Sequence, residues 1–149
     1  MVKETERFLA TMRPRITEVG TAIHNGDSGP WMAMWSRTEP LTLFGAVKSG
    51  RDWGEIEPIF DALGQQFSNC RSYEVEIVTA EARGDLAYIV ALEHTTASIN
   101  GAEPTSYVLR VTTIFRREDG EWMAVHRHGD ALAAAFGIDT GLFASTRNA

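Results

Sequence analysis

The second half of the chain is a succession of four segments with the two-residue period of β-strands, and this pattern limits the fold more than any other feature. The segments are SYEVEIVTAEARG, DLAYIVALEHTTASIN, TSYVLRVTTIFRRE and EWMAVHRHGD. Between them lie Arg83-Gly84-Asp85, Asn100-Gly101 and Asp119-Gly120, each typical of a β-hairpin turn. Strands joined by hairpins pair antiparallel. The sequence therefore predicts an antiparallel meander from about residue 72 to residue 130.

The first half predicts helices. Apolar residues recur at spacings of three and four from Phe8 to Ile23, which indicates a helix with one buried face. Pro14 lies inside this run, so either the helix is kinked there or it begins near Pro14. Pro30 suits the first turn of a short second helix. Residues 53–67 repeat the helical spacing after a short β-rich run at residues 41–46.

Helices followed by an antiparallel meander indicate the α+β class, with the sheet curling over the helices. The chain has 149 residues, enough for one domain with a core and too few for two ordinary domains. We therefore expect a single domain over residues 1–149 with an ordered core at about residues 5–132.

Charge and hydropathy exclude several classes of partner. The net charge is -6, and no Lys/Arg cluster exceeds Arg116-Arg117, so we expect no nucleic-acid partner. No segment approaches the roughly 18 apolar residues of a spanning helix, so we expect no membrane and a cytoplasmic location. The single cysteine, Cys70, excludes an intramolecular disulfide and is expected to be an ordinary loop thiol.

Two segments, MWSRTEPLTLFGA and LRVTTIFRREDGEWMAVHRHGD, resemble the SnoaL-like branch of the nuclear transport factor 2 and ketosteroid isomerase superfamily. The resemblance spans about residues 5–132. It implies a cone of curved antiparallel sheet closed by N-terminal helices, with an internal pocket and a homodimer through the sheet's outer face. Members include isomerases, polyketide cyclases, dehydratases and kinase association domains, so the fold alone does not give the function.

The resemblance leaves two functions open. One is a cofactor-independent isomerase, cyclase or dehydratase that acts on a small hydrophobic molecule by acid-base catalysis. The other is a non-catalytic ligand-binding or dimerisation module. DGEWMAVHRH also resembles the last strand of the association domain of calmodulin-dependent kinase II, in which an arginine one strand earlier lines a polar pocket. Either Arg110 or Thr112 is equivalent to that arginine.

Strict strand alternation places Trp122, Ala124, His126 and His128 on one face. Arg110 is a charge in the middle of an apolar strand, and such a residue is rarely buried without a polar acceptor. Imidazole titrates near neutral pH and suits proton transfer. We therefore predict His126, Arg110 and His128 as pocket and catalytic residues, with His126 the deeper and neutral histidine. The alternative is that the histidines only bond backbone or water at the sheet's end.

Other side chains are expected to contact the ligand, because aromatic residues line many apolar pockets. In the third run, Glu93 alternates to the face opposite Tyr88 and His94. The predicted ligand contacts are Trp35, Phe44, Tyr88, His94 and Thr112.

A metal site would need a third ligand beside His126 and His128, for which Asp130 and His94 are the candidates. Two histidines on a strand are weak support, so we predict no metal and no cofactor. Asp130 is instead expected to cap a short helix over ALAAAF. The tail LFASTRNA is expected to be disordered.

Overall fold

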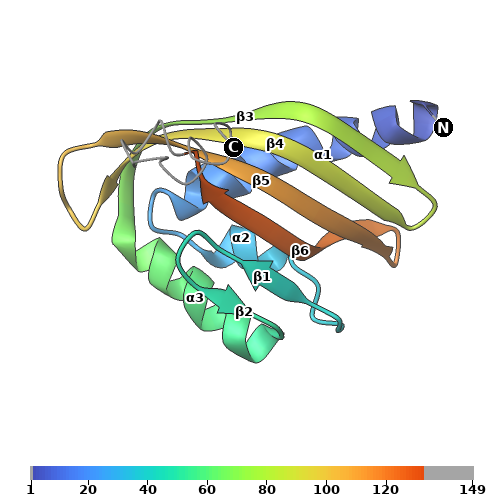
Figure 1. The fold of residues 1–149 in the computed structure, drawn as a ribbon, viewed down its shortest axis with the longest axis horizontal. Helices are drawn as coiled ribbons and strands as arrows, with labels where there is room; N and C mark the ends of the chain where they lie inside the picture. The colour runs from blue at the N-terminus through green and yellow to red at the C-terminus, as the bar shows by residue number, and fades with distance from the viewer. Residues whose placement is uncertain (1, 133–149) are drawn as a thin grey trace, which may run out of the picture.

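A six-stranded sheet covers the long N-terminal helix in the computed structural model, which describes residues 2–132 (Figure 1). The helices are α1 (Val2–Ile23), α2 (Gly29–Ala33) and α3 (Trp53–Gln66). The strands are β1 (Thr42–Phe44), β2 (Ser49–Gly50), β3 (Phe67–Arg83), β4 (Leu86–Ile99), β5 (Thr105–Glu118) and β6 (Glu121–Ala131). None of the helices in this part of the chain is long and apolar enough to cross a membrane.

The strand order in the sheet is β2-β1-β6-β5-β4-β3, and the sheet remains open between β2 and β3. The predicted meander is confirmed, because β3 to β6 pair antiparallel in succession. Asp119 and Gly120 form the turn between β5 and β6 with φ of 50° and 81°. Positive φ at both turn positions matches the right-handed twist of the two strands. The α+β cone implied by the resemblance is the observed architecture.

Helix α1 packs its apolar side against the inner face of the sheet. Phe8 contacts the rings of Phe115 and Trp122 edge-on, at centroid distances of 5.5 and 5.0 Å. The helix runs through Pro14 rather than beginning there. Pro14 is exposed, so the carbonyl group that lacks its helical hydrogen bond can be hydrated. At Gly20 a Cβ atom would lie 2.1 Å from the Tyr73 ring, so glycine permits the close contact between α1 and β3.

A β-bulge interrupts β6 at Val125. Phe115 of β5 pairs with Ala124, but the preceding residue of β5, Ile114, pairs with His126, so Val125 is an extra residue without a direct partner. An extra residue reverses the inward and outward alternation of the rest of the strand.

The bulge corrects the predicted faces of β6. Trp122 and Ala124 are buried on the inner face, at 7% and 0% exposure. Beyond the bulge, Arg127 turns inward, whereas His126 and His128 turn to the outer face. The prediction that both histidines share a face with Trp122 is therefore wrong.

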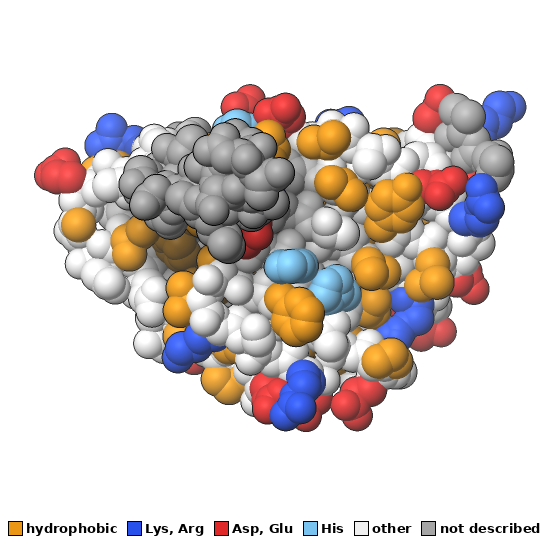
Figure 2. Space-filling view, in the orientation of Figure 1, with side chains coloured by type: hydrophobic (Ala, Val, Ile, Leu, Met, Phe, Trp, Pro, Cys, Tyr) orange, Lys and Arg blue, Asp and Glu red, His pale blue; other side chains and the backbone are white. Residues whose placement is uncertain are grey.

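The outer face of the sheet is turned away from α1 and carries many hydrophobic side chains (Figure 2). In this face Ile114 lies between His126 and Tyr88 on the neighbouring strands. We call it the outer patch, and its apolar members are Phe44, Tyr88, Val90, Leu92 and Ile114.

Cys70 lies in strand β3, so the prediction of a loop position is wrong. Its backbone N–H donates to Asn25 Oδ1 at 2.9 Å. Burial raises the pKa of the thiol, which lowers its reactivity near neutral pH.

Candidate functional site

An ion pair lies on the inner face of the sheet, inside the cone. Arg127 of β6 reaches past β5 to Glu93 of β4 and donates two hydrogen bonds, Nη1 to Oε2 at 2.7 Å and Nη2 to Oε1 at 2.8 Å. The side chains are 12% and 6% exposed. The guanidinium carbon also lies 4.9 Å from the centroid of the Trp31 ring. This fork is the main charged feature of the interior.

The two charges keep each other ionised. Burial by itself would raise the pKa of Glu93, but the Arg127 guanidinium outweighs burial and holds this pKa below its ordinary value. In the same way burial would lower the pKa of Arg127, and the Glu93 carboxylate raises it. The pair is therefore a neutral but strongly polar unit in an apolar surrounding.

A cavity of about 20 Å³ adjoins the pair, large enough for about one water molecule. Most of its wall is apolar, and Glu93 and Arg127 form its charged part. The apolar wall comes from α1, from the α2 segment and from the inner faces of three strands, and includes Ile16, Trp31, Met34, Trp35, Ile89 and Val111.

Two buried indole N–H groups near the ion pair have no acceptor. They belong to Trp31 and Trp35, which both line the cavity. The buried Tyr73 hydroxyl lies beside the Glu93 carboxylate, and burial together with this carboxylate raises its pKa. A buried unpaired polar group costs about 1–3 kcal/mol. An acceptor oxygen within reach of these N–H groups would offset part of this cost.

His24, at the end of α1, extends the polar cluster. Its Nδ1 lies 2.6 Å from Gly20 O and its Nε2 lies 2.9 Å from the Tyr107 hydroxyl. Because a carbonyl oxygen can only accept, Nδ1 carries the proton, and Nε2 of the neutral ring accepts from Tyr107. Burial lowers the pKa of His24, which keeps the ring neutral. Both ring nitrogens are thus engaged within the protein.

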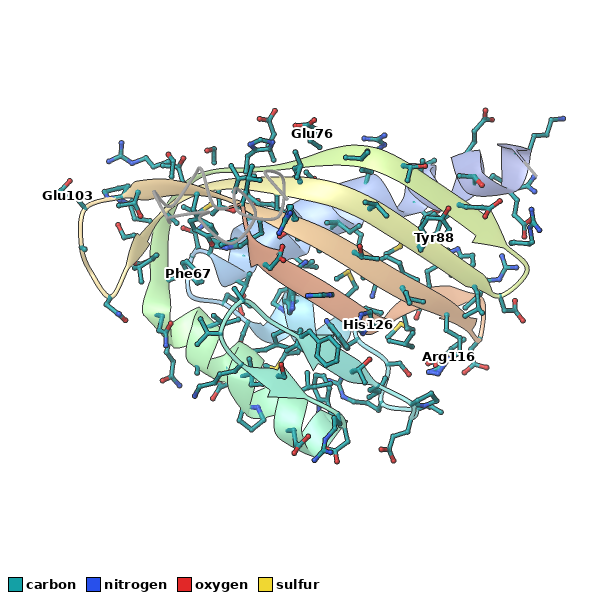
Figure 3. All side chains as sticks on the ribbon, in the orientation of Figure 1. Phe67, Glu76, Tyr88, Glu103, Arg116 and His126 are labelled. Atoms are coloured by element: carbon teal, nitrogen blue, oxygen red, sulfur yellow. The ribbon has the colours of Figure 1, made fainter. Side chains whose placement is uncertain are left out.

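The three residues predicted as catalytic do not lie in this cluster. Arg110 and Asp130 form a fork on the exposed outer face, with Nε–Oδ1 and Nη2–Oδ2 distances of 3.0 Å each. His126 and His128 lie on the same outer face (Figure 3, where His126 is labelled). The prediction that Arg110 and His126 reach one internal cavity is wrong, because β5 alternation and the β6 bulge turn both outward.

The predicted ligand contacts divide between the two faces. Trp35 lines the cavity, whereas Phe44, Tyr88, His94 and Thr112 belong to the outer face. His94 Nε2 lies 2.9 Å from Glu76 Oε1 in an exposed pair. The outer four are therefore placed for contact with another surface and not with a molecule inside the cone.

Asp130, predicted to cap a helix, belongs to β6 and accepts hydrogen bonds from Arg110. Most of ALAAAF and the tail LFASTRNA lie outside the described residues. Within residues 2–132, no group of three or more His, Cys, Asp or Glu side chains could hold a metal ion.

Sequence reasoning missed Glu93, Arg127, Tyr73, Tyr107 and His24 as a cluster. The signal for Glu93 was present, because it is the one charge among the inward residues Ala91, Thr95 and Ala97 of β4. Arg127 could not be found in the same way, since its face depends on the bulge.

The sequence of residues 13–134 matches the family model of the SnoaL-like domain. The chain belongs to this family. No protein with a curated description matches it in sequence. Three solved structures with the same fold are each 20% identical to this chain or less, so they inform the fold alone.

The first is a nuclear transport factor 2-like protein of unknown function from Pseudomonas putida, 19% identical, with a TM-score of 0.67 over 85% of this chain and 88% of that chain. A candidate dehydratase of the same superfamily from Streptomyces avermitilis is 14% identical, with a TM-score of 0.68 over 83% and 93%. The CamKII hub homology domain of Chlamydomonas reinhardtii is 20% identical, with a TM-score of 0.64 over 83% and 97%.

Proposed function

We propose that this SnoaL-like protein is a non-catalytic module that binds a small, largely apolar carbonyl compound inside the cone and associates as a homodimer through its outer patch. The unpaired indole N–H groups of Trp31 and Trp35 beside the Glu93–Arg127 pair carry the binding part of the proposal. Apolar walls suit the body of such a ligand, and the donors suit its oxygen.

Charge decides the class of ligand. Because Glu93 already neutralises Arg127, an anionic ligand would bring an uncompensated negative charge next to a buried carboxylate. A neutral carbonyl oxygen accepts from N–H groups without this penalty. The site therefore favours a ketone or aldehyde over a carboxylate of the same shape.

The cavity sets a requirement for binding. Its volume of about 20 Å³ fits one water-sized group, so a larger ligand must displace part of the wall. The five-residue helix α2 and the residues after it supply Trp31, Met34 and Trp35. We expect this segment to move when the ligand enters.

The state of the polar groups favours binding over the alternative function, an isomerase, cyclase or dehydratase. A general base works best with a pKa near the working pH. The pKa of Glu93 is held below its ordinary value and both nitrogens of His24 are engaged. Neither group is poised to take a proton from a substrate.

Binding can be tested with acetophenone as a neutral probe and benzoate as its anionic counterpart. Two-dimensional ¹⁵N NMR follows the indole N–H signals. We expect acetophenone to shift those of Trp31 and Trp35. The Trp53 signal is an internal control, because that N–H donates to Glu57 near the surface. Equal shifts with benzoate, or no shift with acetophenone, would contradict the binding proposal.

The homodimer is supported by the outer patch, because a sheet face with this many apolar side chains needs cover. Two ion pairs lie beside the patch: Arg110–Asp130 joins β5 to β6, and Arg116–Glu118 lies within β5. Such pairs are typical of the polar rim of a protein–protein interface. Structural neighbours include proteins named as hub and association domains. A two-fold contact would bring the outer patches of two copies together.

Association can be tested by sedimentation equilibrium at neutral pH with a matched pair of variants. Val90→Asp places a charge in the outer patch and should give a monomer. Ala10→Asp introduces the same residue on the exposed side of α1, on the other side of the sheet from the patch, and should remain dimeric. A monomeric wild type at micromolar concentration would contradict the homodimer.

A further inference from the structure

Two histidines flank one aromatic ring in the outer patch. The Phe44 side chain is 45% exposed. Its ring centroid lies 5.7 Å from the His126 ring and 5.6 Å from the His128 ring, each at an interplanar angle of 90°. Figure 2 shows two histidine side chains side by side on this face, next to a hydrophobic side chain. We call these three residues the Phe44 cluster.

The neighbours of the cluster within the sheet are uncharged. On β1, Thr42 Oγ1 lies 2.7 Å from His126 Nδ1. On β5, Ile114 pairs with His126 and Thr112 with His128. Tyr88 follows one strand further, on β4.

The charged groups nearest along the strands are already engaged. Asp130, two residues beyond His128 on β6, accepts both hydrogen bonds of the Arg110 fork. Arg116, two residues beyond Ile114 on β5, donates to Thr38 O at 2.8 Å and pairs with Glu118. Among the described residues, no carboxylate is therefore free beside the cluster to compensate an imidazolium ion.

We propose that the Phe44 cluster makes self-association of this protein pH-dependent, with neutral imidazoles permitting the dimer and imidazolium ions opposing it. This inference rests on the proposed homodimer. A two-fold contact would bring the clusters of both copies into one apolar interface, so that four imidazoles lose water together. A charged group without a partner is costly in such a place.

The sign of the effect follows from proton linkage. Burial and the neighbouring His128 lower the pKa of His126 already in the single chain. Further burial in a dimer would lower it again, so the dimer would bind fewer protons than two monomers. The dimer dissociation constant must then rise as the pH falls through the imidazole range.

The dimer dissociation constant of the wild-type chain, residues 1–149, can be measured by sedimentation equilibrium at about pH 7.5 and about pH 5.5, with EDTA present to exclude metal bridging. If association lowers the pKa of a histidine by one unit, the dimer is up to tenfold weaker at low pH than at high pH for each such histidine. With four imidazoles we expect at least about a tenfold weaker dimer at the lower pH. The double variant His126→Gln/His128→Gln should lose this dependence.

His94→Gln is the matched control, because His94 lies on the same face outside the cluster and pairs with Glu76. It should keep the pH dependence of the wild type. A pH dependence that survives in the double variant, or disappears in His94→Gln, would overturn the assignment to the Phe44 cluster. A wild-type dimer with one dissociation constant at both pH values would overturn the inference and leave the homodimer standing.

A wild type that is monomeric at both pH values would instead refute the homodimer itself. NMR titration gives an independent measurement that does not depend on dissociation. The pKa of His126 should be lower in the wild-type dimer than in a monomer made with the uncharged substitutions Val90→Asn/Leu92→Asn. Equal values would contradict the inference.

Discussion

Arg127 and Glu93 are 34 positions apart in sequence and two strands apart in the sheet, yet they form a two-hydrogen-bond fork inside the cone. Arg127 lies two residues beyond the bulge at Val125, and Glu93 is the inward charge of β4. The ion pair therefore depends on the bulge, because the bulge determines which side chains of β6 face inward.

Replacing one member of this pair should cost far more than replacing both. Arg127→Met leaves the Glu93 carboxylate buried without a counter-ion, so we expect a loss of about 3–5 kcal/mol in the free energy of unfolding. Glu93→Leu/Arg127→Met removes both charges and should recover most of that loss. Urea denaturation measures both values.

The control for this prediction is the exposed fork on the other face. Arg110→Met breaks the pair with Asp130, and because both side chains are about half exposed the change should be within about 1 kcal/mol. If Arg127→Met lowers the free energy of unfolding no more than Arg110→Met does, the inner pair contributes no more to stability than the exposed one.

The ionised Glu93 carboxylate should also make the stability of the fold depend on pH in the acid range. Its pKa in the folded chain is below the ordinary value of 4.5, so its contribution is complete above about pH 4.5 and is lost as the pH falls through the lowered value. Between about pH 5 and pH 3 the wild type should therefore lose more stability than Glu93→Leu/Arg127→Met. Parallel acid denaturation curves for the two proteins would contradict this.

His24 should add a second pH-dependent contribution at higher pH. Because burial lowers its pKa below 6.5, the neutral ring stabilises the fold above about pH 6.5, and this contribution is lost as the pH falls through the lowered pKa. Removing the ring also removes the acceptor of the Tyr107 hydroxyl. His24→Gln should thus melt below the wild type at pH 7.5, with a smaller gap at about pH 5.5. A gap of the same size at both pH values would speak against a titrating His24.

Deleting Val125 tests the role of the bulge. Without the extra residue, Ala124 would still pair with Phe115 and His126 with Ile114, so regular alternation would keep Arg127 inward beside Glu93. We therefore expect the deletion to cost less than the about 3–5 kcal/mol of Arg127→Met, measured by urea denaturation. Deletion of Glu103, an exposed residue of the loop between β4 and β5, is the control and should be tolerated. A Val125 deletion as costly as Arg127→Met would show that the bulge itself holds Arg127 inward.

The sequence by itself determined the elements whose causes are local. The spacing of apolar residues from Phe8 to Ile23 is enough to predict an amphipathic helix, because an α-helix makes one turn every 3.6 residues. The pair Asp119-Gly120 is enough for a hairpin, because glycine and aspartate adopt positive φ at low cost. These elements and the resemblance together gave the correct α+β cone.

Only the tertiary structure decided which residues of the last strand face inward. Nothing in AVHRHGD marks Val125 as an extra residue, because a bulge depends on how β6 pairs with β5. The same segment places His126 inside or outside the cone according to that single residue. The structure places Arg127 inside, where a buried arginine has a counter-ion in Glu93, whereas a buried His126 would leave that carboxylate unpaired. The partner lies on another strand, so its influence cannot be read from the local sequence.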